Sequence, residues 1–247
     1  KTKRADFKSI TAKVYYSVYQ CPFRLAIRHY DAARKIFRDN YRDYITLISP
    51  WYLTVNLNHR IPFFHITGSP SFQEGWKTLG PFPSRHSAAV VMAALEDCFK
   101  LCRKSELTNT PDYAKSCPYL QMDACIGVCA GKVSINDYKK IIEDAFNTGA
   151  KPDEAIGNFE NQMRTAAKEL NFEKAAAIRK KIEKLSVLKK PIYHWTGDLT
   201  KLKIVHIDKS AKVKTEGSKA RKQSYAVFAI NVFQIIDAGD FVWDNSD

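Results

Sequence analysis

The sequence predicts an α+β protein made of several parts, and three features of the chain lead to that prediction. Short runs rich in β-branched and aromatic residues, which are typical of strands, lie near both ends of the chain. Residues 153–188 carry apolar side chains at the spacing of amphipathic helices. Between these regions, residues 98–129 hold five of the six cysteines and show little periodicity. With 247 residues, 45% of them hydrophobic, the chain can form one large domain or several small ones.

The N-terminal residues are expected to form a small α/β unit. The predicted strands are the runs 10–18, 44–48, 51–55 and 63–67. Between the first two runs a helix is predicted over residues 22–41, because Phe23, Ala26 and Tyr30 recur at helical spacing. The segment Gly80-Pro81-Phe82-Pro83-Ser84 then interrupts the strand pattern.

A predicted helix follows this interruption, with Ser84 or Ser87 as its N-cap. Residues 103–133 are rich in Pro, Gly, Ser, Asn and Cys. A loop of that length needs a cross-link to hold its structure, and the cysteines can supply one. Another predicted helix begins after Ser134, where the segment ending at Asp137 resembles a capping box. It continues to about Phe146, and residues 148–152 are expected to end it.

Residues 153–188 show the clearest periodicity and predict a helical hairpin. Its hinge is expected near Asn171, because the apolar stripe changes phase there and Asn tolerates the left-handed backbone conformation. Strand patterns return at 202–207 and 225–236, and these two predicted strands flank a basic polar loop over residues 209–222.

The sequence therefore divides into four predicted parts. They are an α/β unit at 1–80, a cysteine-rich helical region at 81–150, a helical hairpin at 151–190 and a β region at 191–247.

Composition limits the function classes. The chain has 39 Lys and Arg against 26 Asp and Glu, a formal net charge of +13, which favours a polyanionic partner such as nucleic acid. No apolar run approaches the roughly 20 residues that cross a bilayer, and nothing near Lys1 resembles a signal peptide. We therefore expect a cytoplasmic protein without a membrane partner.

The cysteines form a candidate metal site. Four of them are the predicted ligands: Cys102, Cys117, Cys125 and Cys129. Thiolates suit zinc or an iron–sulfur cluster, and Gly127 could provide a tight turn between the last two, although the spacing differs from paired zinc-ribbon knuckles. Cys98 is either a spare ligand or a small core residue. The alternative is that all five clustered cysteines are free buried thiols.

Several segments, taken in order, resemble one family. Leu79-Gly-Pro-Phe-Pro-Ser84 resembles the motif F-G-P-[FY]-P-S, and the segments around Cys102, Cys117 and Cys125 resemble the cysteine-rich region that follows that motif. The stretch from Met163 to Arg179 resembles the UVR motif, M-x-x-A-A-x-x-L-x-F-E-x-A-A-x-[IL]-R. These features resemble the UvrC family, a component of the bacterial excinuclease ABC of nucleotide excision repair. The resemblance extends over roughly residues 8–243 and is closest over 79–188.

The resemblance implies a cofactor and a partner. It implies a [4Fe–4S] cluster on the four cysteines, with zinc as the alternative. It also implies that the UVR hairpin pairs with a matching hairpin on UvrB, another component of excinuclease ABC. The residues expected to bind that partner are Phe159, Met163, Ala167, Leu170, Phe172, Glu173, Ala176 and Arg179. The alternative for the apolar members is ordinary packing within this chain.

The catalytic parts of the family have no counterpart here. Members begin with a GIY-YIG nuclease domain, but neither tripeptide occurs, and the helix that should carry the metal-binding Glu reads Arg24-Leu25-Ala26-Ile27-Arg28-His29. A guanidinium cannot bind Mg²⁺, which prefers oxygen ligands. The family's second, RNase H-like nuclease would supply its acidic residues beyond Asp247. Asp198, Asp208, Asp237 and Asp240 lie near predicted strand ends, but the resemblance assigns no catalytic carboxylate to them.

The sequence thus predicts a DNA repair protein that binds double-stranded DNA and UvrB without nuclease activity of its own. The candidate DNA contacts are Lys180, Lys181, Lys184, Lys219, Arg221 and Lys222, although each could equally belong to a solvated charge run. Two alternatives stay open. One is an active metal-dependent endonuclease whose catalytic parts are absent here, and the other is a metal-stapled protein–protein adaptor.

Overall fold

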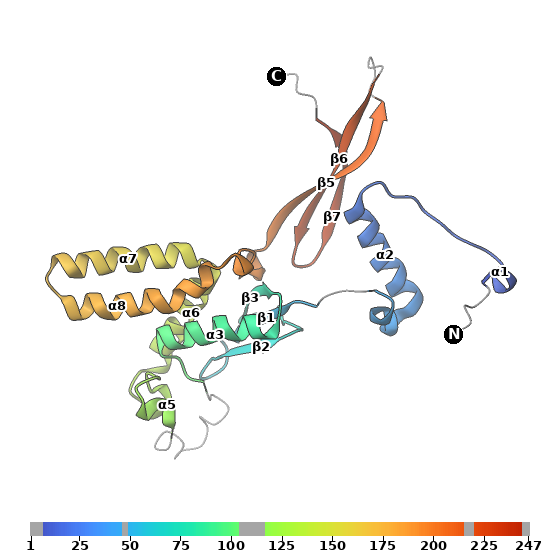
Figure 1. Ribbon diagram of the computed structural model, residues 1–247. Coiled ribbons are helices and arrows are strands. Elements are labelled where there is room, and N and C mark those ends of the chain that lie inside the picture. The colour runs from blue at the N-terminus through green and yellow to red at the C-terminus, as the bar shows by residue number, and fades with distance from the viewer. Residues whose placement is uncertain (1–6, 46–48, 104–116, 215–219, 244–247) are drawn as a thin grey trace, which may run out of the picture. The chain divides into compact units, whose positions relative to one another are not determined.

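The computed structural model describes residues 7–45, 49–103, 117–214 and 220–243. Its contacts divide the chain into two units, one formed by Lys1–Leu47 with Lys203–Asp247 and the other by Ile48–Leu202. Both contain helices and strands, which confirms the α+β class (Figure 1). Within the described ranges, no helix is both long enough and apolar enough to cross a membrane.

The unit Ile48–Leu202 combines a small sheet with a group of helices. The strands are β1 (Trp51–Asn56), β2 (Phe64–Thr67), β3 (Trp76–Phe82) and β4 (Gly197–Asp198), and they form an antiparallel sheet in the order β2-β1-β3-β4. The α-helices are α3 (Arg85–Phe99), α5 (Pro118–Gln121), α6 (Ile135–Ala150), α7 (Pro152–Lys168) and α8 (Phe172–Leu185). Short 3₁₀ turns lie at η3 (Val128–Ala130), η4 (Ser186–Lys189), η5 (Pro191–Tyr193) and η6 (Leu199–Lys201).

One hydrophobic core holds this unit together. It contains Leu53 and Leu79 from the sheet, Leu95 from α3, Ile142 from α6 and Leu185 from α8, each fully buried. These five residues come from three of the four parts predicted from the sequence. The three parts therefore share one hydrophobic core. Strand β3 was not expected, because Gly80 and Pro81 lie inside it; only two residue pairs join this end of β3 to β4.

The helix starts follow the expected capping chemistry. Ser84 Oγ accepts a hydrogen bond from the backbone N–H of Ser87 at 3.0 Å, and Ser134 Oγ accepts one from Asp137 N–H at 3.1 Å. Helix α6 continues past Phe146 through Gly149 and ends at Ala150, within the segment 148–152 that was expected to end it. Gly149 allows α6 to pack closely against β3, since a Cβ at that position would lie only 2.7 Å from Leu79 Cδ2.

The hairpin of α7 and α8 is confirmed (Figure 1). The turn lies where it was expected, but Leu170 rather than Asn171 adopts the left-handed conformation, with φ of 57°. Asn171 instead caps α8, and its Oδ1 accepts a hydrogen bond from Lys174 N–H at 3.1 Å.

The second unit contains α1 (Phe7–Ile10), α2 (Pro22–Phe37), the 3₁₀ turn η1 (Arg38–Asp43) and an antiparallel sheet. The sheet has the order β5-β6-β7, with β5 at Lys203–Lys214, β6 at Arg221–Asn231 and β7 at Ile235–Val242. The prediction of a polar loop over 209–222 is therefore wrong for most of that range, because pairing between β5 and β6 continues to Lys214 and Arg221. The expected strand at 225–236 is in fact the end of β6, a turn and the start of β7.

The expected strand at 10–18 is also wrong. Residues 11–19 contain no regular structure, and Tyr15 and Tyr16 are 87% and 88% exposed. β-branched and aromatic residues favour a strand only where another strand supplies backbone partners and a packing face. For the expected strand at 44–48, Tyr44 and Ile45 are outside any strand and residues 46–48 lie outside the described ranges.

Helix α2 packs on one face of its sheet. The Phe23 ring lies 4.9 Å from that of Phe228, and Asp208 Oδ2 accepts a hydrogen bond from Phe23 N–H at 3.0 Å. Arg24 binds Asp237 through two hydrogen bonds, Nε to Oδ2 at 2.6 Å and Nη2 to Oδ1 at 2.8 Å, and Asp240 Oδ1 accepts a third at 2.9 Å. These contacts direct the three carboxylates toward the helix.

Candidate functional site

The α7–α8 hairpin buries a small set of side chains and exposes its turn. Ile156, Ala166, Ile178 and Leu185 are buried, as expected for the inner face of two short amphipathic helices. Leu170 and Phe172, which flank the cap residue Asn171, are 73% and 66% exposed. The turn is the end of the hairpin farther from the sheet of its unit (Figure 1). It therefore presents two large apolar side chains to solvent.

The predicted partner-binding residues divide into two groups. Phe159 is half-buried against the main core, and the ammonium of Lys181 lies 5.7 Å from its ring centroid. Phe159 is thus a packing residue in this chain. Met163 is half-buried, and the remaining predicted residues are exposed: Ala167, Leu170, Phe172, Glu173, Ala176 and Arg179. The structure brings this second group together around the turn and along the helices beside it.

A pocket of about 560 Å³ lies between the two helices. Met163 and Ile182 contribute its apolar surface, and Glu160, Arg164, Arg179 and Glu183 surround it with charge. Arg179 Nε donates to Glu183 Oε1 at 3.0 Å, which fixes these two lining side chains. A pocket lined by apolar and charged side chains suits an inserted side chain from a second helical element.

The four predicted metal ligands come from separate short elements. Cys102 follows α3, Cys117 precedes α5, Cys125 lies in the loop after α5 and Cys129 is in η3. Gly127 has a φ of 77°, so the expected tight turn between the last two cysteines is present. Ile126 N–H donates to the Lys100 carbonyl at 2.9 Å, which holds this loop beside the end of α3.

Electrostatic interactions connect the four thiols. A side-chain hydrogen bond with Cys102 lowers the pKa of Cys125, against the effect of burial. Burial raises the pKa of Cys129, and the neighbouring Cys125 and Cys117 raise it further. Cys102, Cys117 and Cys125 are buried and Cys129 is half-buried. Among the described residues, however, no three His, Cys, Asp or Glu side chains are arranged to hold a metal ion.

Two neighbours of the cysteines were not identified from the sequence. Tyr138 is fully buried in α6, and its hydroxyl oxygen accepts a hydrogen bond from Cys102 N–H at 3.1 Å. Arg103 Cζ lies 5.1 Å from the Tyr119 ring centroid, and Arg103 also pairs with Glu96 and Asp97. The position of Arg103 directly after Cys102 was a possible signal, whereas nothing in the local sequence links Tyr138 to this loop.

The predicted DNA contacts have different surroundings. Lys180 is exposed on α8, but Lys181 lies over Phe159, and Lys184 Nζ donates to the Asp97 carbonyl at 3.3 Å. Arg221 and Lys222 begin β6 rather than lying in a loop, and Lys219 lies outside the described ranges.

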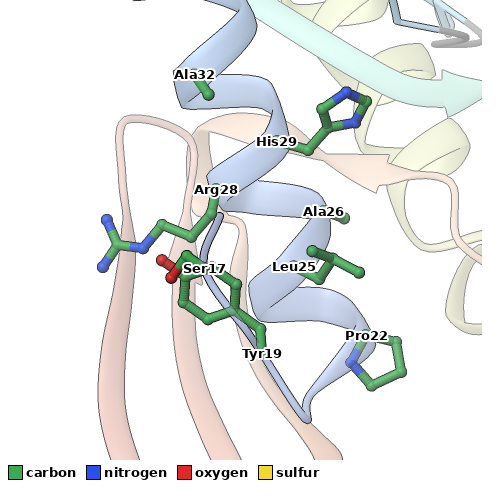
Figure 2. Close-up of a pocket in the computed structure, with 8 residues that line it drawn as sticks. All are labelled: Ser17, Tyr19, Pro22, Leu25, Ala26, Arg28, His29 and Ala32. Carbon is green, nitrogen blue, oxygen red and sulfur yellow. The ribbon is translucent and has the colours of Figure 1, made fainter. Parts of the chain in front are cut away.

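The described residues along α2 do not form a group of catalytic carboxylates. A pocket of about 560 Å³ lies along this helix, lined by Ser17 and Tyr19 before it and by residues such as Arg28 and His29 within it (Figure 2). None of the described residues lining it is Asp or Glu. The carboxylates of Asp208, Asp237 and Asp240 bind the start of α2, while Asp198 Oδ1 accepts from Thr200 N–H at 3.0 Å.

Comparison with known proteins identifies the family. The model of the UvrC/Cho excinuclease middle domain matches residues 51–148, and that of the UvrB/uvrC motif matches residues 153–188. No solved structure matches the chain.

Three curated relatives are each named UvrABC system protein C. The protein of Syntrophus aciditrophicus is 28% identical over 133 residues, covering 53% of this chain and 21% of the relative. That of Caldicellulosiruptor saccharolyticus is 26% identical over 179 residues, covering 71% and 28%. That of Ruminiclostridium cellulolyticum is 32% identical over 143 residues, covering 56% and 22%.

These alignments cover only 21% to 28% of the relatives' own length. They nevertheless agree with the two family models, which include the cysteine loop and the exposed hairpin. By its middle domain and its UVR motif, this chain belongs to the UvrC family of excinuclease proteins.

Proposed function

We propose that this chain is a DNA repair protein that docks UvrB through the α7–α8 hairpin and holds double-stranded DNA on its basic surface. The observation that carries the proposal is the exposure of Leu170 and Phe172 at the hairpin turn. Full burial of an apolar side chain of this size stabilises an interface by about 1.5–3 kcal/mol. A matching helical hairpin on UvrB could cover both side chains and the pocket beside Met163.

The docking proposal can be tested by calorimetric titration of the full chain with purified UvrB. Leu170→Ala and Phe172→Ala should each raise Kd by about tenfold, because each removes one anchor from the interface. Leu25→Ala on α2 and Phe233→Ala in the β6–β7 turn are matched controls, since both parent side chains are exposed. An unchanged Kd in both hairpin variants, with measurable binding by the parent, would reject this docking site.

The proposed DNA contacts include three basic residues outside the hairpin and basic residues of α8 within it. Simultaneous Lys219→Ala, Arg221→Ala and Lys222→Ala changes should flatten the dependence of duplex affinity on salt, because each lost phosphate contact reduces the slope by about 0.9. Lys180→Ala tests the hairpin's own contribution to the same slope. A slope equal to that of the parent protein would reject the assignment for the residues changed.

We propose that the chain itself does not cut DNA. The α2 pocket has no carboxylate among its described lining residues, and three of the four candidate aspartates hold α2 on the sheet. Nicked and damaged duplexes incubated with the chain and Mg²⁺ or Mn²⁺ should therefore remain intact. Metal-dependent cleavage by the parent chain would overturn the proposal.

We also propose that Cys102, Cys117, Cys125 and Cys129 hold a [4Fe–4S] cluster as a structural staple. Soft thiolate donors suit iron and sulfide, and the tight turn at Gly127 between Cys125 and Cys129 supports the proposal. The four described thiols are not arranged to hold a metal ion in this structure, so cluster binding requires them to move. Anaerobic purification should give stoichiometric iron and sulfide, lost in Cys125→Ser but retained in Cys98→Ser. Zinc in place of iron, or no metal, would contradict the cluster.

A further inference from the structure

The two faces of the sheet β5-β6-β7 differ in their charged side chains, because the strand aspartates lie on one face and most strand cations lie on the other. Asp208, Asp237 and Asp240 lie on the face that α2 covers, where they accept hydrogen bonds from Phe23 N–H and the Arg24 guanidinium. Side chains alternate between the faces of a strand. The opposite face therefore carries the residues between these positions.

Cations and aromatic rings share the opposite face. In the strand register, Lys209 pairs with Tyr225 and Tyr225 pairs with Phe241, so these three side chains form a row across the sheet. Toward the β5–β6 turn, Lys212 pairs with Gln223 and Lys214 pairs with Arg221 on the same face. Directly opposed side chains on adjacent strands lie within contact distance of one another.

The rings on this face are accessible. Phe241 is 49% exposed. Trp243 directly follows Val242, the last residue of β7, and is 67% exposed; side-chain alternation continued one residue past the strand would place it on the side of Phe241. Tyr225 is half-buried between its neighbours. We define the basic aromatic face as Lys209, Lys212, Arg221, Tyr225, Phe241 and Trp243. No described acidic residue of the three strands lies on it, because all three strand aspartates point toward α2.

We propose that the basic aromatic face binds single-stranded nucleic acid. Exposed aromatic rings on a sheet can stack on unpaired bases, and neighbouring cations neutralise the phosphates. Base pairs inside a duplex do not expose their ring faces, so stacking favours the single-stranded form. The proposal extends the proposed repair function to a site on the other structural unit from the hairpin. It uses none of the hairpin residues and shares only Arg221 with the proposed duplex contacts.

Charge argues against a second copy as the occupant. Two basic aromatic faces brought together would oppose Lys209, Lys212 and Arg221 with the same cations, and like charges in direct opposition are destabilising. The face does continue into apolar side chains, with Ile207 beside Val227 and Val205 beside Ala229. A second copy held by that apolar continuation is therefore an outcome that the experiment must separate.

Fluorescence anisotropy with the full chain tests the proposal. The probes are a labelled oligothymidine of about 16 nucleotides and a duplex of equal length. The parent should bind the single strand at least about tenfold more tightly than the duplex, and Phe241→Ala with Trp243→Ala should weaken single-strand binding by about tenfold or more. Phe241→Tyr with Trp243→Phe should retain most of the affinity, because both replacements can stack.

A second variant keeps the test independent of any folding defect in the first. Lys212→Gln with Arg221→Gln should reduce the slope of log affinity against log salt for the single strand by about 1.4, since each single-strand phosphate contact contributes about 0.7. Phe233→Ala and Lys35→Gln are matched exposed controls and should leave both affinity and slope unchanged.

Three results would overturn the proposal. They are equal affinity of the parent for duplex and single strand, unchanged single-strand binding in both variant pairs, and a concentration-dependent dimer that Phe241→Ala with Trp243→Ala dissociates. Leu170→Ala should leave single-strand binding intact while weakening the docking of UvrB, so the two proposals can fail separately.

Discussion

Gly149, in the last turn of α6, lies directly against Leu79 of β3. A Cβ at position 149 would stand 2.7 Å from Leu79 Cδ2 and 3.1 Å from Leu95 Cδ1. Both leucines are fully buried, so neither can move aside without disturbing the core. The absence of a side chain at this position thus allows α6 to approach both the sheet and α3.

Gly149→Ala should lower the free energy of unfolding of the parent chain by about 1–2 kcal/mol, because overpacking outweighs the gain in helix propensity. Gly157→Ala, in the middle of α7, is the matched control. No atom lies within 4 Å of a Cβ built there, so this change should stabilise the chain by up to about 1 kcal/mol. Urea unfolding measures both, and equal effects would contradict the packing explanation.

Tyr138→Phe should destabilise the cysteine loop. The change removes the buried acceptor of Cys102 N–H, and an unsatisfied buried donor costs about 1–3 kcal/mol. Tyr193→Phe makes the same change at a hydroxyl that donates to the Ser87 carbonyl at 3.4 Å, a longer and weaker bond. Urea unfolding should therefore show the larger loss for Tyr138→Phe, and the reverse order would show that the hydrogen bond does not hold Cys102.

Glu96 should make stability depend on pH. Burial raises the pKa of this carboxyl from 4.5 to about 7, although the Arg103 charge, with Nε 3.6 Å from Oε2, partly opposes the shift. The folded chain then binds the proton more tightly than the unfolded chain, so the free energy of unfolding falls as pH rises from 4.5 to about 7. Glu96→Gln should flatten this decline, which urea unfolding at several pH values would detect.

The control for Glu96 is Glu143→Gln, which removes a carboxylate that pairs with Lys77 and whose side chain is 42% exposed. This variant should keep the pH dependence of the parent chain. If Glu96→Gln also keeps it, the buried carboxyl is not its source.

The sequence was most informative where local chemistry determines structure. The serine caps at Ser84 and Ser134, the hairpin and the turn at Gly127 all follow from side chains acting on their own backbone or from a 3.6-residue period. The family resemblance added the UvrC family and the UVR motif, which the comparisons bear out.

Features that depend on distant partners were missed. Residues 11–19 have strand composition but no strand neighbour, whereas β5 and β6 extend through lysine-rich segments because each supplies the other's backbone partners. Glycine is common where helices end, so the sequence did not indicate that α6 includes Gly149. Its close packing against Leu79 explains why α6 continues through this position. The placement of the three strand aspartates on one face of the β5-β6-β7 sheet and of most strand cations on the other likewise depends on register, which local composition does not fix.

Hydrogen exchange of the chain, with and without purified UvrB, tests the docking proposal most directly. Binding should slow exchange in the residues around the hairpin turn, from Met163 to Arg179, while the β5-β6-β7 sheet keeps its own rates. Complex formation with unchanged exchange across Met163 to Arg179 would contradict the central claim that this hairpin is the docking surface.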